Sequence, residues 1–392
     1  MHVGVFTDSY RPYTSGVVRS IETFRAELEA EGLSFFIFAP NYPGVCPEER
    51  VFRFPSVPAP TNPDFTLAIP FSLKIAGKLK NMKLDLVHVH SPFILGSLGA
   101  RWARRLGIPL VFTYHTLYEE YVHYFPLLQK MARKVTRQYT IRFCNRCDLV
   151  LAPAAAIKEY LVKAGVRTRV EYLPTGIDLN AFRDGDRQGF RRRYGIGFDE
   201  PVLLYVGRMG KEKNVGFLLR AFRGVSDRVE RIWLVLVGGG PAKERLAAEA
   251  VRLGVANRVI FTGPVPPDKV KDCYAAGDIF VMSSLTETQG LVLGEAKAAG
   301  LPAVAVRAQG VSEMVNEGVD GFLTPLDEAV FAEKVCRLLA DSGLYRSMKQ
   351  NALIHSEEIA ASRMAKRLQE YYQALCRSTG ESFTTVTRRH RG

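Results

Sequence analysis

Short apolar runs alternate along the chain with longer segments in which apolar and polar residues recur at helical spacing. Residues 278–282, Asp-Ile-Phe-Val-Met, have the length of a strand buried on both faces, and residues 290–299 have the pattern of a helix. Similar apolar runs predict strands at residues 2–7, 35–39, 51–54, 86–90, 110–114, 149–153, 202–206, 232–237, 259–263 and 301–306. Strands that alternate with helices predict an α/β fold with parallel, doubly wound sheets.

The junction between the strand at 278–282 and the helix at 290–299 is the most informative stretch. A loop that leads from the carboxyl end of a strand into a helix is where open α/β sheets bind ligands. Near Gly290 and Leu291, the amides of the first helical turn have no intrahelical acceptor and lie at the positive end of the helix dipole. We therefore expect a phosphate group to bind there.

Two carboxylates bracket this anion site, Glu287 before the helix and Glu295 within it. Carboxylates repel a diphosphate, but they accept hydrogen bonds from hydroxyl groups strongly. The economical interpretation is that they face hydroxyl groups on either side of the phosphates, which describes a sugar, a diphosphate and a ribose in line. By their spacing alone, the two residues could equally be a helix cap and a solvent-exposed helix residue.

The length of 392 residues suits two domains, and the 47% apolar and 24% charged residues are typical of a globular protein. Residues 183–197, rich in Gly, Asp and Arg, are interpreted as the linker into the second domain.

No apolar run reaches about 18 residues, so no membrane-spanning helix is expected. The N-terminus enters a strand pattern without signal-peptide features, which predicts a cytoplasmic protein with six reduced cysteines.

The net charge of +13 is distributed unevenly. Residues 65–146 contain thirteen Lys or Arg against three Asp or Glu, an excess that indicates an anionic partner, either a membrane leaflet or a nucleic acid. Two helical apolar stripes flanked by basic residues lie in this segment: Phe71, Ile75, Leu79 and Met82, and Leu128, Met131, Val135 and Tyr139. Each stripe alone fits packing on the sheet, but with the basic excess they favour an anionic membrane surface.

Two motifs match the letters of metal sites. Cys144-Asn-Arg-Cys147 has no second cysteine pair and falls in a basic helical stretch, and Asp184-Gly-Asp186 lies in a turn-rich segment far from any expected strand end. We interpret the cysteines as structural and the aspartates as part of a solvated loop. The sequence therefore predicts no metal ion and no cofactor.

Histidines gather at the expected carboxyl edge of the first sheet. His88 and His90 alternate with valines, so they share one face of their strand. They could form a metal-binding pair, although no acid or third histidine is near in sequence; otherwise His90, at the end of the strand, borders the ligand site. His115 follows the strand at 110–114 and reaches the same edge, where ligands collect.

The first strand, loop and helix, the helix running from about residue 19 to 31, form a Rossmann-like unit that lacks Gly-x-Gly-x-x-Gly. A dinucleotide-dependent dehydrogenase is therefore disfavoured. Residues 7–17, with Asp8 and Gly16, instead resemble the opening of a glycosyltransferase family in which this glycine lets the backbone approach the donor phosphate. Many members have two glycines here, and Ser15 stands in the place of the first.

Other motifs strengthen this resemblance. The Glu-x7-Glu spacing of Glu287 and Glu295 resembles the signature of retaining glycosyltransferases with the two-Rossmann GT-B fold, a large family that includes bacterial lipid glycosyltransferases. Arg208 and Lys213 resemble the family's Gly-Arg and Lys-Asn motif, and two cations suit a diphosphate. The string at residues 115–124 is similar to that of the diacylglycerol glucosyltransferase branch.

The resemblance implies a role for each matching residue. Arg208, Lys213, Glu287 and His115 would be catalytic, with the cations on the leaving diphosphate and His115 on the primary hydroxyl of the donor sugar. Gly16, Gly290, Leu291 and Glu295 would bind the nucleotide-sugar donor, and Asp8, Tyr118, Tyr121 and His123 would lie on the acceptor side.

The resemblance also implies an architecture and an activity. Residues 1–175, with residues from about 364 to 392 crossing back, would form an acceptor-binding domain, and residues 176–363 a nucleotide-sugar-binding domain that faces it across a cleft. The expected enzyme is a metal-independent, retaining hexosyltransferase that uses a nucleotide-diphosphate sugar, UDP-glucose above all, and glycosylates a lipid such as diacylglycerol at the inner face of the cell membrane. The alternatives are a transferase for a soluble small molecule, a phosphatidylinositol mannosyltransferase-like enzyme and, in another class, a basic nucleic-acid-binding protein.

Overall fold

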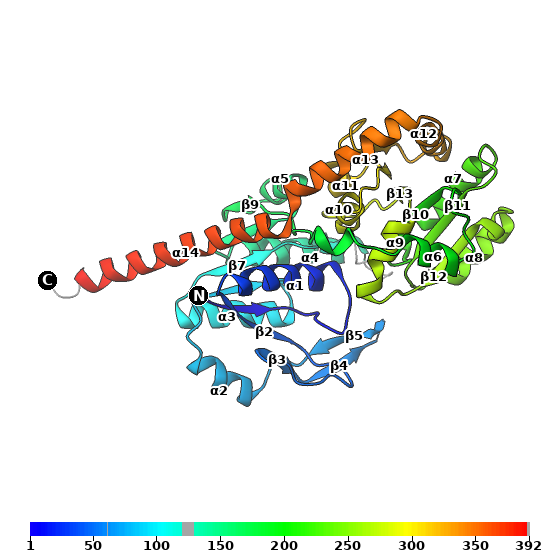
Figure 1. Cartoon of the computed structure of the whole chain (residues 1–392). Coiled ribbons are helices and arrows are strands. Elements are labelled where there is room, and N and C mark those ends of the chain that lie inside the picture. The colour runs from blue at the N-terminus through cyan, green and yellow to red at the C-terminus, as the bar shows by residue number, and fades with distance from the viewer. Residues whose placement is uncertain (61, 120–128, 390–392) are drawn as a thin grey trace. The chain divides into compact units, whose positions relative to one another are not determined.

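A computed structural model describes residues 1–60, 62–119 and 129–389, except for the side chains of residues 62–64, 129 and 379–389. The chain divides into two compact units, Met1–Gly176 with Ala361–Gly392 and Ile177–Ala360. Each unit contains a parallel sheet with helices packed on its faces (Figure 1), which confirms the predicted α/β fold. Within the described ranges, no helix is both long and apolar enough to cross a lipid bilayer.

The first unit is built on a parallel sheet. Its strands are β1 His2–Phe6, β2 Ser34–Pro40, β3 Val51–Phe54, β6 Leu86–Val89, β7 Leu110–Thr113, β8 Leu149–Ala152 and β9 Val170–Tyr172. They pair in the order β3-β2-β1-β6-β7-β8-β9. All residues of β6, β7 and β8 are buried, as expected for parallel strands covered on both faces. A separate antiparallel hairpin consists of β4 Ser56–Ala59 and β5 Asn62–Ala68.

Helices cover both faces of this sheet: α1 Gly16–Ala30, α2 Leu73–Asn81, α3 Ile94–Leu106, α4 Gln129–Cys144, α5 Ala155–Lys163 and α14 Ala361–Arg389. The first helix begins at Gly16 rather than near residue 19, because the Ser15 side chain accepts a hydrogen bond from the Val18 amide and caps the helix. In Figure 1, α14 (red) crosses the sheet beside α1 (blue), and its buried Leu368 and Tyr372 join the same core as Phe24 of α1.

The second unit repeats the scheme with strands β10 Val202–Val206, β11 Trp233–Val237, β12 Val259–Gly263, β13 Ile279–Met282, β14 Ala303–Val306 and β15 Gly321–Thr324. They pair in parallel in the order β12-β11-β10-β13-β14-β15. Residues 321–324 form the edge strand β15, which pairs with β14 in parallel.

The helices of the second unit are α6 Arg187–Arg193, α7 Val215–Ser226, α8 Lys243–Arg252, α9 Val270–Ala276, α10 Leu291–Ala298, α11 Gln309–Met314, α12 Glu328–Ala340 and α13 Ser342–Ser356. Two apolar clusters lie on opposite faces of the sheet and account for the burial of its strands, one containing Leu203 and Val281 and the other Leu204 and Phe280.

The segment 183–197 contains α6, so its interpretation as a linker is wrong, whereas Asp184 and Asp186 are exposed in the loop before α6, as the sequence predicts. Asp186 caps α6 by accepting a hydrogen bond from the Gly189 amide. The Arg191 guanidinium is buried and pairs with Asp278 at 2.8 Å, while Arg187 pairs with the other oxygen of Asp278 at 2.7 Å. Desolvation by burial lowers the pKa of Arg191 despite the nearby carboxylate. These charged contacts are long-range, so the local composition gave no sign of them.

Candidate active site

The loop between β13 and α10 has the geometry of an anion site. Gly290, the residue before α10, has φ 79°, a left-handed conformation that glycine adopts without strain. No side chain caps α10. The Leu293 amide of its first turn donates to the Gly290 carbonyl oxygen at 2.8 Å, which leaves the amides at Gly290 and Leu291 to be offered to a ligand. Phosphate oxygens are natural partners for such amides at the positive end of a helix.

Lys213 and Glu287, separated by 74 residues, form an ion pair beside this helix. Lys213 ends the 3-10 turn Lys211–Lys213 after β10, and both side chains are largely but not fully buried. The Ser283 hydroxyl holds the two loops together by donating to the carbonyl oxygens of Lys213 and Asn214 at 3.1 and 3.0 Å. The predicted cation and the predicted first carboxylate therefore lie together, although the sequence did not indicate that they pair.

Arg208 lies in the loop after β10, on the same carboxyl edge of the sheet. Its carbonyl accepts a hydrogen bond from the Tyr205 hydroxyl at 3.0 Å, while its side chain is exposed and makes no ion pair within the described part of the chain. Burial raises the pKa of Tyr205, and the charges of Glu287 and Glu212 raise it further, which puts this turn near Glu287. Arg208 thus offers an uncompensated cation at the edge where a diphosphate would bind.

Glycines missed by the sequence reasoning bring the backbones of these loops together. A Cβ on Gly310 would lie 2.6 Å from the Glu287 carbonyl oxygen and 2.4 Å from the Thr288 carbonyl carbon. The Gly310 amide donates to that Glu287 oxygen at 3.1 Å. Likewise, a Cβ on Gly238 would lie 2.2 Å from the Gly207 carbonyl oxygen. The sequence gives no sign of these close approaches, because they join residues that are distant along the chain.

Glu295 lies inside α10 with only 1% of its surface exposed. Its carboxylate accepts a hydrogen bond from the Tyr274 hydroxyl of α9 at 2.6 Å. It is therefore not a solvated helix residue, and Glu287 does not cap α10. Buried carboxylates are rare without hydrogen-bond partners, and the Tyr274 hydroxyl is one partner of Glu295.

In the first unit, the predicted residues collect at the carboxyl ends of neighbouring strands. Asp8 follows β1, His90 follows β6 and His115 follows β7, and these three strands pair side by side in parallel. Gly16 is the first residue of α1, at the end of the loop that follows β1. Tyr121 and His123 lie outside the described residues.

Three histidines form a row at this edge, in which His88 and His90 are buried and His115 is partly exposed. His90 Nδ1 and His115 Nε2 are 2.8 Å apart, so one ring donates a hydrogen bond to the other. His88 contacts the Tyr372 hydroxyl at 2.6 Å and the Thr113 hydroxyl at 2.7 Å. Burial lowers the pKa of His88 and of His115 to about 3, and burial together with the neighbouring imidazoles lowers the pKa of His90 well below its usual value. The row is neutral at physiological pH.

Asp8 supports the start of α3. One carboxylate oxygen accepts a hydrogen bond from the Leu95 amide at 2.8 Å, and the other accepts one from the Ser91 hydroxyl. Burial raises the pKa of Asp8 despite these donors. Burial and, second, the nearby Asp8 raise the pKa of Tyr118, whose ring packs edge-on against Phe93. Asp8 and Tyr118 are thus neighbours, as expected for one site, but Asp8 already has partners in the protein.

The two cysteines considered as metal ligands, Cys144 and Cys147, pack in the hydrophobic core. Cys144 and Cys147 are both buried in the core beneath α4, and burial raises the pKa of each thiol. Within the described ranges, no group of three or more His, Cys, Asp and Glu side chains could hold a metal ion. The absence of a metal and a cofactor from the reaction stays a prediction.

Comparison with known proteins places the chain in a family. The model of Glycosyltransferase Family 4 matches residues 14–181, and that of Glycosyl transferases group 1 matches residues 186–354. The alpha-monoglucosyldiacylglycerol synthase of Streptococcus pneumoniae is 32% identical, over 95% of this chain and 85% of that protein. The chain belongs to the GT-B glycosyltransferases. The synthase of the same name from Acholeplasma laidlawii is 29% identical to this glycosyltransferase, over 96% of this chain and 97% of that protein.

Solved structures agree on the fold of the glycosyltransferase. Anabaena HepE in complex with UDP matches it with a TM-score of 0.76 and 21% identity, over 96% of this chain and 100% of that one. HepE with UDP-glucose matches with the same TM-score and 20% identity. The predicted family and enzyme class are therefore confirmed, and a nucleic-acid-binding protein is not favoured.

Proposed function

We propose that this glycosyltransferase transfers glucose from UDP-glucose to a lipid acceptor of the diacylglycerol type, with retention of the anomeric configuration. The names of its Streptococcus and Acholeplasma relatives support the lipid product, and the HepE complexes support the donor. The observation that carries the proposal is the Lys213–Glu287 pair beside the uncapped start of α10. This arrangement offers a cation, a hydroxyl acceptor and free amides to a sugar diphosphate.

Each residue near the donor has a proposed task. The α10 amides at Gly290 and Leu291 bind the diphosphate, and Arg208 and Lys213 neutralise the negative charge that grows on it as UDP leaves. Glu287 accepts hydrogen bonds from hydroxyl groups of the hexose, at the cost of part of its pairing with Lys213. The ribose binds beside Glu295, whose carboxylate is oriented by the Tyr274 hydroxyl.

In the first unit, His115 binds the primary hydroxyl of the hexose and Gly16 lets the backbone approach the diphosphate. A neutral imidazole suits this task because it can donate to or accept from a hydroxyl. Tyr118, Tyr121 and His123 bind the acceptor, and Asp8, which holds the start of α3, lies near Tyr118 on the same side.

Retention follows if the acceptor attacks from the face that the diphosphate leaves. The bond between the anomeric carbon and the diphosphate oxygen breaks, the acceptor oxygen bonds to the same carbon, and the acceptor proton passes to the departing phosphate oxygen. The chain then needs no covalent nucleophile. The donor sugar of UDP-glucose is an α anomer, so we expect an α-glucoside; NMR of the product would decide, and a trapped glycosyl-enzyme would contradict this route.

The acceptor requires a membrane, and the basic excess in residues 65–146 fits an anionic leaflet at the inner face of the cell membrane. The predicted stripes divide in a way that supports this role. Ile75 and Leu79 are buried in the core, as the packing alternative predicted, but Phe71, Met131 and Val135 are exposed by 69%, 57% and 59%. We propose that these exposed side chains and the surrounding cations hold the enzyme at the lipid surface.

An assay of UDP release tests the proposal. UDP-glucose with diacylglycerol in mixed micelles should release UDP and yield a glucolipid, whereas soluble sugars or RNA in place of the lipid should not. Arg208→Ala and Glu287→Gln should abolish transfer with unchanged far-UV circular dichroism, and the exposed Glu244→Gln is the matched control. Near-normal turnover by either site variant, or transfer to a soluble acceptor without lipid, would refute the assignment.

A further inference from the structure

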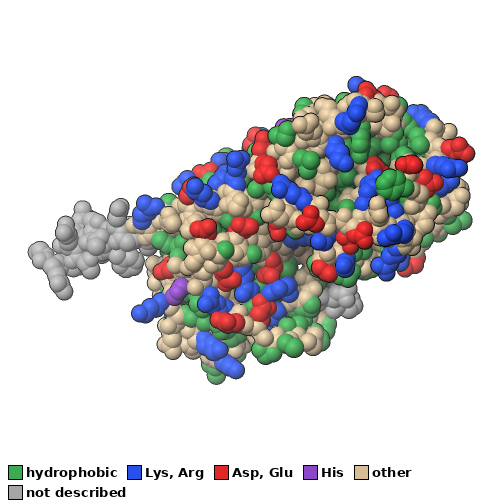
Figure 2. Space-filling model, in the orientation of Figure 1, with side chains coloured by type: hydrophobic (Ala, Val, Ile, Leu, Met, Phe, Trp, Pro, Cys, Tyr) green, Lys and Arg blue, Asp and Glu red, His purple; other side chains and the backbone are tan. Residues whose placement is uncertain are grey.

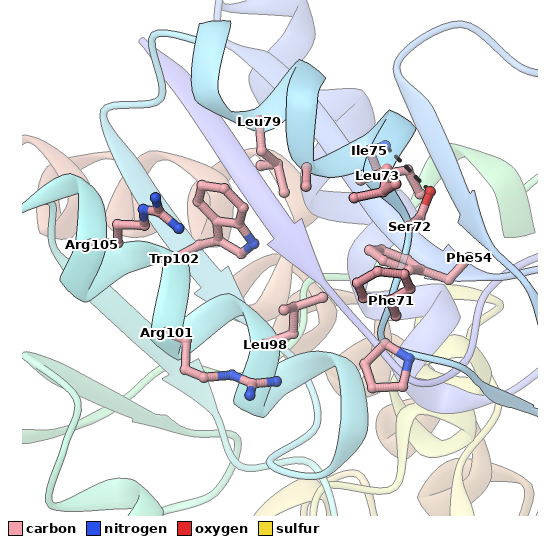
Figure 3. A pocket seen from close by; sticks show the side chains of 12 residues that line it. Phe54, Phe71, Ser72, Leu73, Ile75, Leu79, Leu98, Arg101, Trp102 and Arg105 are labelled. Carbon is pink, nitrogen blue, oxygen red and sulfur yellow. Dashed lines mark hydrogen bonds between the residues drawn. The ribbon is translucent and has the colours of Figure 1, made fainter.

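A cavity of about 260 Å³ lies in the first unit between α2 and α3, away from the carboxyl-edge residues described above. Its walls are mostly apolar (Figure 3) and consist of Phe54, Pro70, Phe71, Ser72, Leu73, Ile75, Ala76, Leu79, Leu98, Arg101, Trp102 and Arg105. Drug-sized ligands occupy pockets of about 300–1,000 Å³. The cavity is therefore suited to one part of a larger apolar ligand, such as a length of hydrocarbon chain.

Trp102 gives this apolar cavity a polar donor. The residue is 8% exposed, but its indole nitrogen is not among the buried side-chain nitrogens that lack a partner, so the N–H remains open to solvent. Figure 3 shows the ring between Leu79 and Leu98, with its nitrogen turned into the cavity. An indole N–H that is open to solvent can donate to a ligand atom in place of water. A ligand that fits must combine a hydrocarbon part with a hydrogen-bond acceptor, as an acyl ester does.

The mouth of the cavity is apolar and exposed. Phe71 and Leu73 line it with 69% and 77% of their surfaces exposed, the largest exposed fractions among the large hydrophobic residues of the described chain. Beside them, Val57 and Leu67 of the hairpin are cross-strand partners and are also exposed. Exposed apolar side chains that gather in this way mark a surface that is covered by a partner or a membrane.

The rim of the cavity is positively charged. Arg101 and Arg105 of α3 line it, and the Arg105 guanidinium lies over the Trp102 ring, 5.4 Å from its centroid. Lys74 and Lys78 of α2 and Arg104 of α3 belong to the same two helices, neither of which contains an acid. None of these five side chains forms an ion pair within the part of the chain that the structure describes. Figure 2 shows Lys and Arg side chains beside hydrophobic ones in the region of α2 and the hairpin. An uncompensated rim of this kind is complementary to a phosphate group.

We propose that this cavity binds one acyl chain of an anionic phospholipid from the bilayer. The chain enters between Phe71 and Leu73, the Trp102 N–H donates to the ester carbonyl, and Arg101 and Arg105 bind the phosphate. The proposal rests on the proposed action at a membrane, but it adds a lipid site distinct from the residues assigned to donor and acceptor.

Tryptophan fluorescence tests the proposed lipid site directly, because one of the two tryptophans of the chain, Trp102, lines the cavity. Trp233→Phe removes the one in the second unit, whose indole bonds to Glu200, and leaves Trp102 as the only reporter. With vesicles of phosphatidylglycerol whose acyl chains carry bromine, most of the Trp102 emission should be quenched. The converse variant, Trp102→Phe, should show no quenching. Vesicles of brominated phosphatidylcholine alone should quench Trp102 far less.

Two further variants separate the cavity from adhesion to the surface. Ala76→Phe, made in the Trp233→Phe protein, fills the cavity and should abolish quenching while the protein still sediments with the vesicles. Replacing Arg101 and Arg105 with Gln should weaken binding by about fivefold per arginine. The same change at Arg192 and Arg193, two exposed arginines of the second unit, should leave binding unchanged.

Vesicle binding without quenching of Trp102 would overturn the cavity site and leave surface attachment intact, and equal quenching by phosphatidylcholine would overturn its preference for anionic lipid. Glucose transfer to diacylglycerol in detergent is measured in parallel. Failure of transfer with quenching intact would refute the proposed function alone, so the two proposals can fail separately.

Discussion

His90 Nδ1 and His115 Nε2 share a hydrogen bond of 2.8 Å between residues at the ends of adjacent parallel strands. The two rings are also stacked, with 5.1 Å between their centroids. The ring proposed to bind the donor sugar therefore has its orientation fixed by a neighbour that need not touch the substrate. His90 is a positioning residue for His115, which the sequence suggested only as a histidine that borders the ligand site.

Replacing His90 should impair transfer through the orientation of His115. We expect His90→Ala to lower kcat by on the order of 10- to 100-fold with a smaller change in KM for UDP-glucose, because a misplaced contact costs most in the transition state. His90→Asn retains a hydrogen-bonding group and should restore part of the loss. Equal activity of His90→Ala and the wild type in the UDP-release assay would show that His115 needs no such support.

The row of His88, His90 and His115 should make the free energy of unfolding decrease in acid. Burial lowers the pKa of His88 and His115 to about 3, whereas unfolded histidines titrate near 6.5. As the pH falls from about 6.5 toward 3, the unfolded chain takes up protons that the native state does not, so the free energy of unfolding decreases. The slope is about 1.4 kcal/mol per pH unit for each such histidine.

Urea unfolding at several pH values measures this linkage. Carboxylates titrate in the same range, so the informative quantity is the difference between the wild type and His115→Gln, whose pH slope should be smaller by one proton. The exposed His2→Gln is the control and should keep the wild-type slope. Identical slopes for all three proteins would mean that His115 is not held neutral in the native state.

Lys213 should contribute to catalysis and its neighbour Lys211 should not. Lys213→Ala removes the partner of Glu287 and a charge proposed to stabilise the leaving diphosphate. A loss of this kind costs on the order of 100- to 1,000-fold in kcat. Lys211 lies in the same 3-10 turn, is exposed and makes no ion pair within the described residues. Lys211→Ala should therefore leave kcat near the wild-type value. A similar fall in kcat for both variants would mean that the net positive charge of this turn matters, and not a specific contact made by Lys213.

Gly310 should be intolerant of a methyl group. In Gly310→Ala the added Cβ would meet the carbonyl groups of Glu287 and Thr288 at 2.4 to 2.6 Å, so the loop that carries Glu287 must move. We expect a loss of about 1–3 kcal/mol in the free energy of unfolding and a marked fall in kcat. Gly224→Ala is the control, since its Cβ would meet only the Ala332 Cβ, at 3.4 Å. Normal turnover by Gly310→Ala would show that the Glu287 loop is not fixed there.

The sequence alone determined the fold class and the family. Apolar runs of strand length and amphipathic helices between them predicted parallel sheets. A strand that is buried on both faces is apolar at every position, and a helix that is buried on one face has apolar residues at helical spacing. The motifs around Arg208, Lys213, Glu287 and Glu295 identified the glycosyltransferase. At residues 183–197 the local composition misled, because long-range contacts such as those of Arg191 with Asp278 decide whether such a segment is a linker or a helix.

Only the tertiary structure decided which residues meet. The pairing of Lys213 with Glu287, of Glu295 with Tyr274 and of His90 with His115 joins segments up to 74 residues apart, and no periodicity records such contacts. The sequence also could not predict that Ile75 is buried while Phe71 is exposed, since both belong to one apolar stripe. Hydrophobic spacing tells which face of an element is apolar, but which neighbour covers that face depends on how the sheets and helices pack in space.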